Sequence, residues 1–182
     1  MITRTKAQEI LFDNLKNESL RKHCLATAFI MEKLAETTAN DRDKWFITGL
    51  LHDIDLEYIG DDFAQHGFKA VQILKDVDIT EEMKNAIVRH SGNAPLETVL
   101  DKALWIADPV NGLIIASALM RPDKKISSVK LKSLLKKYKT KSFAAGVSRE
   151  QIAYCVELGF ELNNYLQLAL DALADKEELL GF

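Results

Sequence analysis

The stretch Trp45-Phe-Ile-Thr-Gly-Leu-Leu-His-Asp, residues 45–53, decides how this chain is expected to fold. A run too apolar to face water leads directly into His52 and Asp53, so we expect an inward-pointing helix to end on this pair. A buried carboxylate with no cation nearby is costly, because water no longer stabilises its charge. Either a metal ion neutralises Asp53 or Asp53 caps the next turn, and the dipeptide alone leaves both interpretations open.

The same helical pattern extends through the rest of the chain. Apolar residues recur at i, i+3, i+4 and i+7 almost everywhere, while alternation with a period of two is hard to find, so we predict an all-α fold of roughly eight or nine helices. Thr80 and Ser148 have the sequence context of N-caps. The expected helices cover residues 4–15, 19–38, 42–53, 63–76, 80–90, 97–107, 110–120, 127–137 and, as a C-terminal extension, 148–174.

Composition limits the class of protein. A chain of 182 residues with 47% hydrophobic content is expected to form a single domain, 1–182, with a real core. The net charge of -3 argues against a surface that coats nucleic acid or membrane. Cys24 and Cys155 fit buried thiols, the N-terminal residues lack a signal sequence, and no apolar run approaches the roughly 20 residues of a membrane span. We therefore expect a cytoplasmic protein without disulfides and without a membrane partner.

A basic segment, residues 124–141, holds eight lysines and no acid. Such a segment could attract phosphate or nucleic acid. Its apolar residues recur at helical spacing and it lacks the interleaved aromatic residues of a stacking platform, so we favour a solvated helix face over nucleic-acid binding.

The remaining histidines and one aspartate share the apolar surroundings of the pair His52-Asp53. His23 lies on or beside a buried helix face, His66 precedes Gly67, and His90 ends a helix. Asp108 precedes Pro109, where we expect the helix to break and Asp108 either to point into a cavity or to cap the next helix. Each residue alone has an ordinary structural explanation, such as the helix dipole for His90.

Together these six residues favour a shared metal site. Neutral imidazoles and carboxylates without thiolates suit one or two divalent transition-metal ions, namely Fe, Mn, Co, Ni or Zn. Gly67 would then leave room for an ion or a substrate. Asp55 and Asn111 are candidates for orienting the imidazoles, but we favour a turn or cap role for both. Arg89, Lys69 and Lys22 lie near proposed ligands, but each is expected to point into solvent rather than at a phosphate.

The order His23, His52-Asp53, Asp108 resembles the HD superfamily of metal-dependent phosphohydrolases. The resemblance covers about residues 20–120 and implies that these four residues hold one ion. His66 and His90 resemble the additional ligands of the two-metal members, with the bacterial dinucleoside tetraphosphatase group as the closest motif pattern. The resemblance further implies that a hydroxide bridging the metals attacks a phosphoester or phosphoanhydride, with His52 and Asp53 at the catalytic centre. We expect a small phosphorylated substrate, a nucleotide before other classes, and leave a homo-oligomer open. The alternative is a regulatory or ligand-binding HD domain with metal but little turnover.

Overall fold

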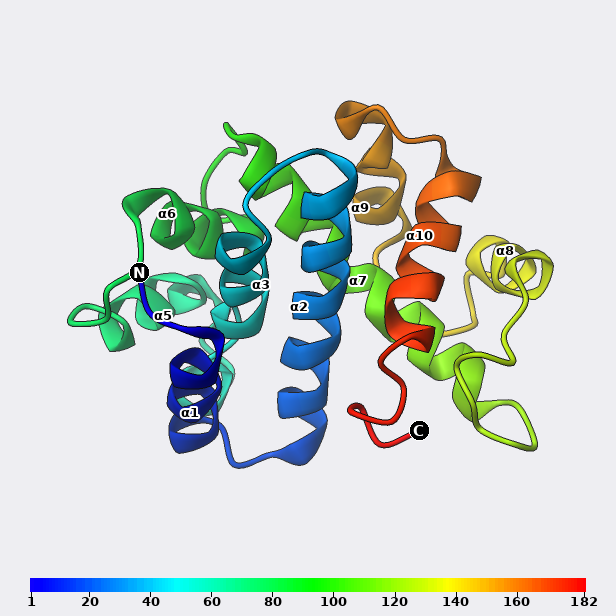
Figure 1. Ribbon diagram of the computed structural model, residues 1–182, viewed down its shortest axis with the longest axis horizontal. Helices are drawn as coiled ribbons and strands as arrows, with labels where there is room; N and C mark the ends of the chain where they lie inside the picture. Colours follow the sequence, from blue (N-terminus) through cyan, green and yellow to red (C-terminus); the bar gives the residue numbers. More distant parts are fainter.

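The computed structural model describes all 182 residues, and it is entirely helical (Figure 1). The all-α prediction is therefore confirmed, with ten α-helices and two short 3-10 helices where roughly eight or nine helices were expected. In chain order the elements are α1 Arg4–Asn14, α2 Glu18–Thr37, α3 Arg42–Leu51, α4 Leu56–Ile59, η1 Phe63–Gln65, α5 Phe68–Ile73, α6 Glu81–His90, α7 Val99–Leu119, α8 Leu131–Lys139, α9 Arg149–Ala153, η2 Tyr154–Leu158 and α10 Leu162–Ala174.

The long helices α2 and α7 form the centre of the molecule, with α1, α3, α5 and α6 on one side and α8, α9 and α10 on the other (Figure 1). Their inward faces belong to one cluster of 44 buried apolar residues, so all parts of the chain share a single core. Helices α2 and α3 lie in close contact at Gly49, where an added Cβ would lie 2.9 Å from Met31 Cγ and 3.0 Å from Ala28 Cα. A glycine is needed there because two helix backbones meet.

Helix α7 corrects the prediction of two helices at 97–107 and 110–120. It runs unbroken through Pro109, and its N-cap is Thr98, which forms a capping box with Asp101. A proline inside a helix costs about 3 kcal/mol, because it removes one hydrogen bond and crowds the preceding turn. Since 13 of the 21 residues of α7 are buried, packing outweighs this cost. Asp108 consequently lies within a helix and caps nothing.

The length of α7 also corrects the expectation that no segment is long enough for a membrane span. Val99–Leu119 is long and apolar enough by length and composition, but 56% of its most apolar window is buried within the protein. It is the central helix of the core described above.

Two further helix predictions were wrong in their continuity. Residues 148–174 form α9, η2 and α10 instead of one helix, because Gly159 adopts a left-handed conformation with φ of 80° between η2 and α10. Residues 63–76 divide into η1 and α5 around Gly67, which also has φ of 80°. A positive φ stops a helix and favours glycine. The short α4 was not predicted.

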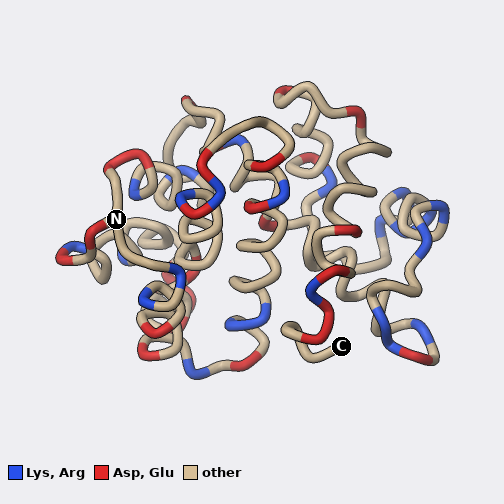
Figure 2. The backbone as a smooth tube through the Cα atoms, viewed as in Figure 1, with Lys and Arg blue, Asp and Glu red and all other residues tan.

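The basic segment 124–141 folds with its apolar side inward. Ile126, Val129 and Leu134 are buried, and α8 begins at Leu131 rather than at 127. Figure 2 places its lysines at the edge of the molecule opposite α5 and α6. The amphipathic arrangement predicted for this segment is confirmed.

Candidate metal centre

The six predicted ligands come from five places in the fold and converge on one site. His23 lies on α2, His52 and Asp53 follow the end of α3, and His66 precedes α5. His90 is the last residue of α6, and Asp108 lies in the middle of α7. Their side chains form two groups that share Asp53, and within each group the possible ligand atoms lie within 4.8 Å of one another.

The first group is His23, His52, Asp53 and Asp108. His23 Nε2 lies 3.3 Å from His52 Nε2, 3.2 Å from Asp53 Oδ2 and 2.9 Å from Asp108 Oδ1. His52 Nε2 lies 3.3 Å from Asp53 Oδ2 and 3.7 Å from Asp108 Oδ1. Ligands about 2.1 Å from a shared ion are about 3.0 Å apart at right angles and about 3.4 Å apart in a tetrahedron. These four residues therefore fit one metal ion.

The second group is Asp53, His66 and His90. Asp53 Oδ1 lies 3.3 Å from His66 Nε2 and 3.2 Å from His90 Nε2. The two oxygens of Asp53 thus face different groups, Oδ2 the first and Oδ1 the second. A carboxylate in this position can bridge two ions, and three protein ligands in the second group leave coordination positions for water or a substrate oxygen.

Each of the four histidines is held in place through its other ring nitrogen. Nδ1 of His52 donates to the carbonyl of Gly49 at 2.8 Å, and Nδ1 of His90 donates to the carbonyl of Ile87 at 2.5 Å. An acceptor at Nδ1 keeps the proton there and leaves the lone pair of Nε2 for a metal. These two carbonyls lie three residues before their histidines, so the ends of α3 and α6 orient their own ligands.

Asn111 orients His23, which corrects the preference for a turn or cap role at this residue. Its Oδ1 lies 3.1 Å from His23 Nδ1, while its Nδ2 donates to Thr27 Oγ1 at 2.8 Å and to the Asp108 carbonyl at 2.9 Å. The two donor contacts fix which end of the amide faces the imidazole. The sequence reasoning did not assign Thr27, although its position four residues after His23 on α2 places it on the same helix face.

Asp55 combines the two roles that the sequence left open. Its Oδ1 accepts from His66 Nδ1 at 3.0 Å, and its Oδ2 accepts from the backbone N–H groups of Gly67 at 2.8 Å and Ala70 at 3.0 Å. One buried carboxylate therefore orients His66 and caps the start of α5.

Gly67 serves a different purpose from the one predicted. Its φ is 80°, and an added Cβ would lie 2.7 Å from the Ile87 carbonyl oxygen and 2.9 Å from Val88 Cα. The glycine lets α5 approach the backbone of α6 next to the carbonyl that holds His90. The missing side chain thus makes room for a helix instead of an ion.

Burial and charge act in opposite directions on the pKa values of the imidazoles. Burial lowers the pKa of His23, but hydrogen bonds with Asp108 and Asp53 outweigh it and raise the pKa to about 10. Burial likewise lowers the pKa of His52, while the charge of Asp53 and contact with Asp108 raise it to about 9. Burial raises the pKa of Asp53, and its imidazole neighbours bring it well below the usual range. Protons and divalent cations therefore compete for the same Nε2 atoms.

The site opens to solvent on one side. His52, His90 and Asp53 are buried, whereas the side chains of His23 and Asp108 are each 26% exposed. A substrate can therefore approach along the His23 and Asp108 side.

The three basic residues considered as phosphate ligands have other partners. Arg89 donates to Asp101 Oδ2 at 2.9 Å and to Glu97 Oε2 at 2.5 Å, so it joins α6 to the start of α7. Lys69 donates to Gln72, and the Lys22 ammonium lies against Gly181. None of these contacts involves the metal centre, but the expectation that Arg89 points into solvent was wrong, because its side chain is only 14% exposed and pairs with two carboxylates.

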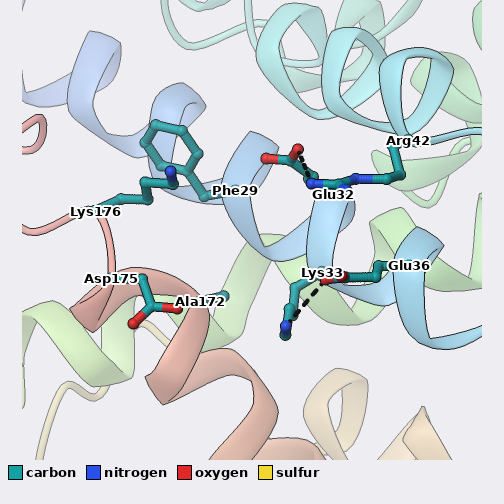
Figure 3. Close-up of a pocket in the computed structure, with 8 residues that line it drawn as sticks. All are labelled: Phe29, Glu32, Lys33, Glu36, Arg42, Ala172, Asp175 and Lys176. Carbon is teal, nitrogen blue, oxygen red and sulfur yellow. Dashed lines mark hydrogen bonds and ion pairs between the residues drawn. The ribbon is translucent and has the colours of Figure 1, made fainter.

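A separate hollow lies between α2 and the C-terminal end of α10 (Figure 3). Four of its six charged residues pair within it, Arg42 with Glu32 at 2.8 Å and Lys33 with Glu36 at 3.0 Å. None of the metal-centre residues lines it. It is therefore distinct from the metal centre.

Comparison with known proteins agrees with this site. The search of curated proteins found no match. The sequence model of the HD domain matches residues 20–130, which is more than half of the chain and includes all six converging residues. With an all-helical fold and a His/Asp cluster able to hold divalent metal, the chain belongs to the HD domain family.

Proposed function

We propose that this protein is a metal-dependent phosphohydrolase that cleaves a phosphoester or phosphoanhydride of a nucleotide. The observation that carries the proposal is the shared Asp53, whose two oxygens face two separate groups of possible ligands. When bound, a pair of ions supplies an activated water and neutralises charge on the attacking and leaving oxygens of a phosphoryl group. The choice of a nucleotide rests on the motif resemblance to the dinucleoside tetraphosphatase group.

The protein residues act in this proposal by holding and orienting. His23, His52 and Asp108 would hold the first ion, and His66 and His90 the second, with Asp53 between them. His52 is fully buried and its Nδ1 is bound to Gly49, so it acts as a ligand and does not exchange protons with a substrate. The phosphate would enter at the exposed edge formed by His23 and Asp108. The expected cytoplasmic location and a homo-oligomer stay predictions.

The test combines metal analysis with a substrate panel. Purified protein is expected to contain about two transition-metal ions and to release phosphate or a nucleotide product from at least one of several nucleoside mono- and polyphosphates and a dinucleoside tetraphosphate. Asp53→Asn removes the bridging charge with little change in shape. We expect it to lose metal from both groups and to lower kcat/KM by at least about 100-fold.

Asp61→Asn is the matched control, because Asp61 is an exposed carboxylate close to Asp53 in the chain but outside both groups. It should keep metal content and activity. Full activity of wild-type protein after complete metal removal would refute the proposal. Binding of metal and nucleotide without any turnover would instead identify a regulatory HD domain.

A further inference from the structure

A pocket of about 470 Å³ lies beside the first half of α7, between the loop that precedes it and the segment α9–η2. Two aromatic residues, Trp105 and Tyr154, and one aliphatic residue, Leu96, supply its apolar walls, while Ser148, Glu150 and Gln151 supply polar groups. The hollow is broad and open to solvent, and its mixture of apolar walls with a few polar groups suits one face of a flat ligand.

Helix α7 connects this pocket to the metal centre. Trp105 and Asp108 are three residues apart, and Gly112 follows seven residues after Trp105, so all three lie along one face of the helix. The rise between Trp105 and Asp108 is about 4.5 Å. One residue that lines the pocket is therefore within one helical turn of a proposed ligand of the first ion.

A second contact connects the same indole to the other group of ligands. Gly92 follows His90 by two residues, and a Cβ added to it would lie 3.8 Å from Cη2 of Trp105. The indole therefore reaches the loop that leaves His90. Trp105 therefore lines the pocket and also lies against the loop that follows His90.

The opposite wall of the pocket is built in advance by Arg149. Its guanidinium donates to the carbonyls of Ala144 at 2.6 Å and Val147 at 2.7 Å, and also to that of Phe143. These bonds fix the loop that leads into α9, and Val147 then packs on α7, 3.2 Å from a Cβ added to Gly112. The segment that carries Gln151 and Tyr154 is thus held against α7 without any ligand.

The charge of the pocket excludes a phosphate. Glu150 is its one charged residue, and no lysine or arginine lines it. An anion would be repelled there, while a flat uncharged ring gains from contact with the indole and the phenol and can donate its amino groups to Glu150. The group in the pocket must differ in charge from the group at the metals.

From these observations we propose that this pocket binds the base of a nucleotide substrate, with Trp105 and Tyr154 as the residues that contact the base. The proposal rests on the proposed function, since it requires the phosphates of the same molecule to lie at the metal centre. A single ribose joins a base to its first phosphate and bridges the one-turn separation along α7.

The first test measures binding of the base without any phosphate. The chain has two tryptophans, and Trp45 is only 3% exposed in the core, so a fluorescence change reports on Trp105. Adenosine added to chelator-treated protein should quench the emission in a saturable way. Trp105→Phe should abolish the response, and Tyr154→Leu should weaken binding about 5- to 100-fold. Val156→Ala, an exposed neighbour of Tyr154 outside the pocket, should bind as wild type. No saturable quenching at millimolar adenosine, guanosine, cytidine or uridine would overturn the proposal.

The second test compares substrates with and without a base. The pairs are adenosine 5′-monophosphate with ribose 5-phosphate, and adenosine triphosphate with inorganic tripolyphosphate. Tyr154→Leu and Trp105→Leu should raise KM for the nucleotide about 5- to 100-fold and leave the base-free partner within twofold. Circular dichroism verifies that both variants fold. If Trp105→Leu does not fold, Trp105→Phe, which preserves an aromatic ring, takes its place.

The two proposals fail in different ways. If the variants raise KM equally for the nucleotide and for its base-free partner, or for neither, the base pocket is overturned while the proposed hydrolysis stands. Saturable adenosine binding in a protein that hydrolyses nothing supports the base pocket and removes the proposed hydrolysis.

Discussion

Replacing Asp55 by alanine is expected to separate the two halves of the metal centre. Asp55 is fully buried and accepts three hydrogen bonds, one from His66 and two from the backbone at the start of α5. None of its side-chain hydrogen bonds goes to a residue of the first group. Its loss should therefore release His66 and leave the first group intact.

The magnitude follows from the three donors that lose their acceptor. Each unsatisfied buried N–H costs about 1–3 kcal/mol, so the two backbone groups and the imidazole together should cost about 3–9 kcal/mol of the free energy of unfolding. For a chain of this size that corresponds to a fall in Tm of about 6–36 °C. An outer hydrogen-bond partner of a metal-binding histidine contributes about 10- to 100-fold in metal affinity, so the second ion should bind that much more weakly.

Metal affinity is measured by calorimetric titration of chelator-treated protein and by metal analysis after dialysis. Stability is measured by chemical denaturation. Wild type should show two binding events and Asp55→Ala one event of unchanged affinity and one that is weakened. Asp101→Ala is the matched control, because Asp101 is equally buried and accepts from two backbone N–H groups and Arg89, but outside both groups. It should cost similar stability and leave both metal affinities unchanged. Two ions bound with wild-type affinity by Asp55→Ala would refute the reasoning.

Two other perturbations give sharp expectations. Gly67→Ala combines a positive φ with a clash 2.7 Å from the Ile87 carbonyl, so unfolding measurements should show a loss of at least about 2 kcal/mol together with weaker binding of the second ion. Gly60→Ala, which has a positive φ but no atom within 4 Å of the added Cβ, should leave metal binding unchanged, and an equal metal defect in both variants would contradict the steric explanation.

The metal-free protein should lose stability with rising pH, because the pKa values of His23 and His66 are raised from 6.5 to about 10. Their contribution to the free energy of unfolding is therefore complete below pH 6.5 and disappears as the pH passes 10. Calorimetry from pH 6 to 10 should show that Tm in chelator falls as the pH rises. The stabilisation by added Mn²⁺ should grow over the same range, because the ion displaces those protons. A Tm in chelator that does not change with pH would contradict the pairing of these histidines with the aspartates.

The sequence predicted the metal centre well because a histidine or aspartate in apolar helical surroundings has few possible roles. The apolar run before His52 and Asp53 indicated that the pair would be buried, and six nitrogen and oxygen donors in apolar helical surroundings indicated that they would meet. Donor type and burial are local properties, so they can be judged without knowing which helices pack together.

Other features depended on tertiary packing and could not be predicted. Pro109 signals a helix end by local rules, yet the buried faces of α7 keep the helix continuous. Asp55 could be a cap or an orienting group, and only the position of α5 beside it shows that it is both. Trp105 and Tyr154 are far apart in the chain, and nothing in their local sequence indicates that they line one pocket.

The wide separation of the ligands along the chain has a consequence for the order of folding. The first donor is at residue 23 and the last at residue 108, so the nascent chain cannot complete the centre until α7 has emerged and packed against α2. A short zinc-binding loop can gather its metal early and use it to fold, but a cation bound at this centre would meet a finished tertiary structure. Its binding would therefore report correct assembly, which burial of the apolar core drives.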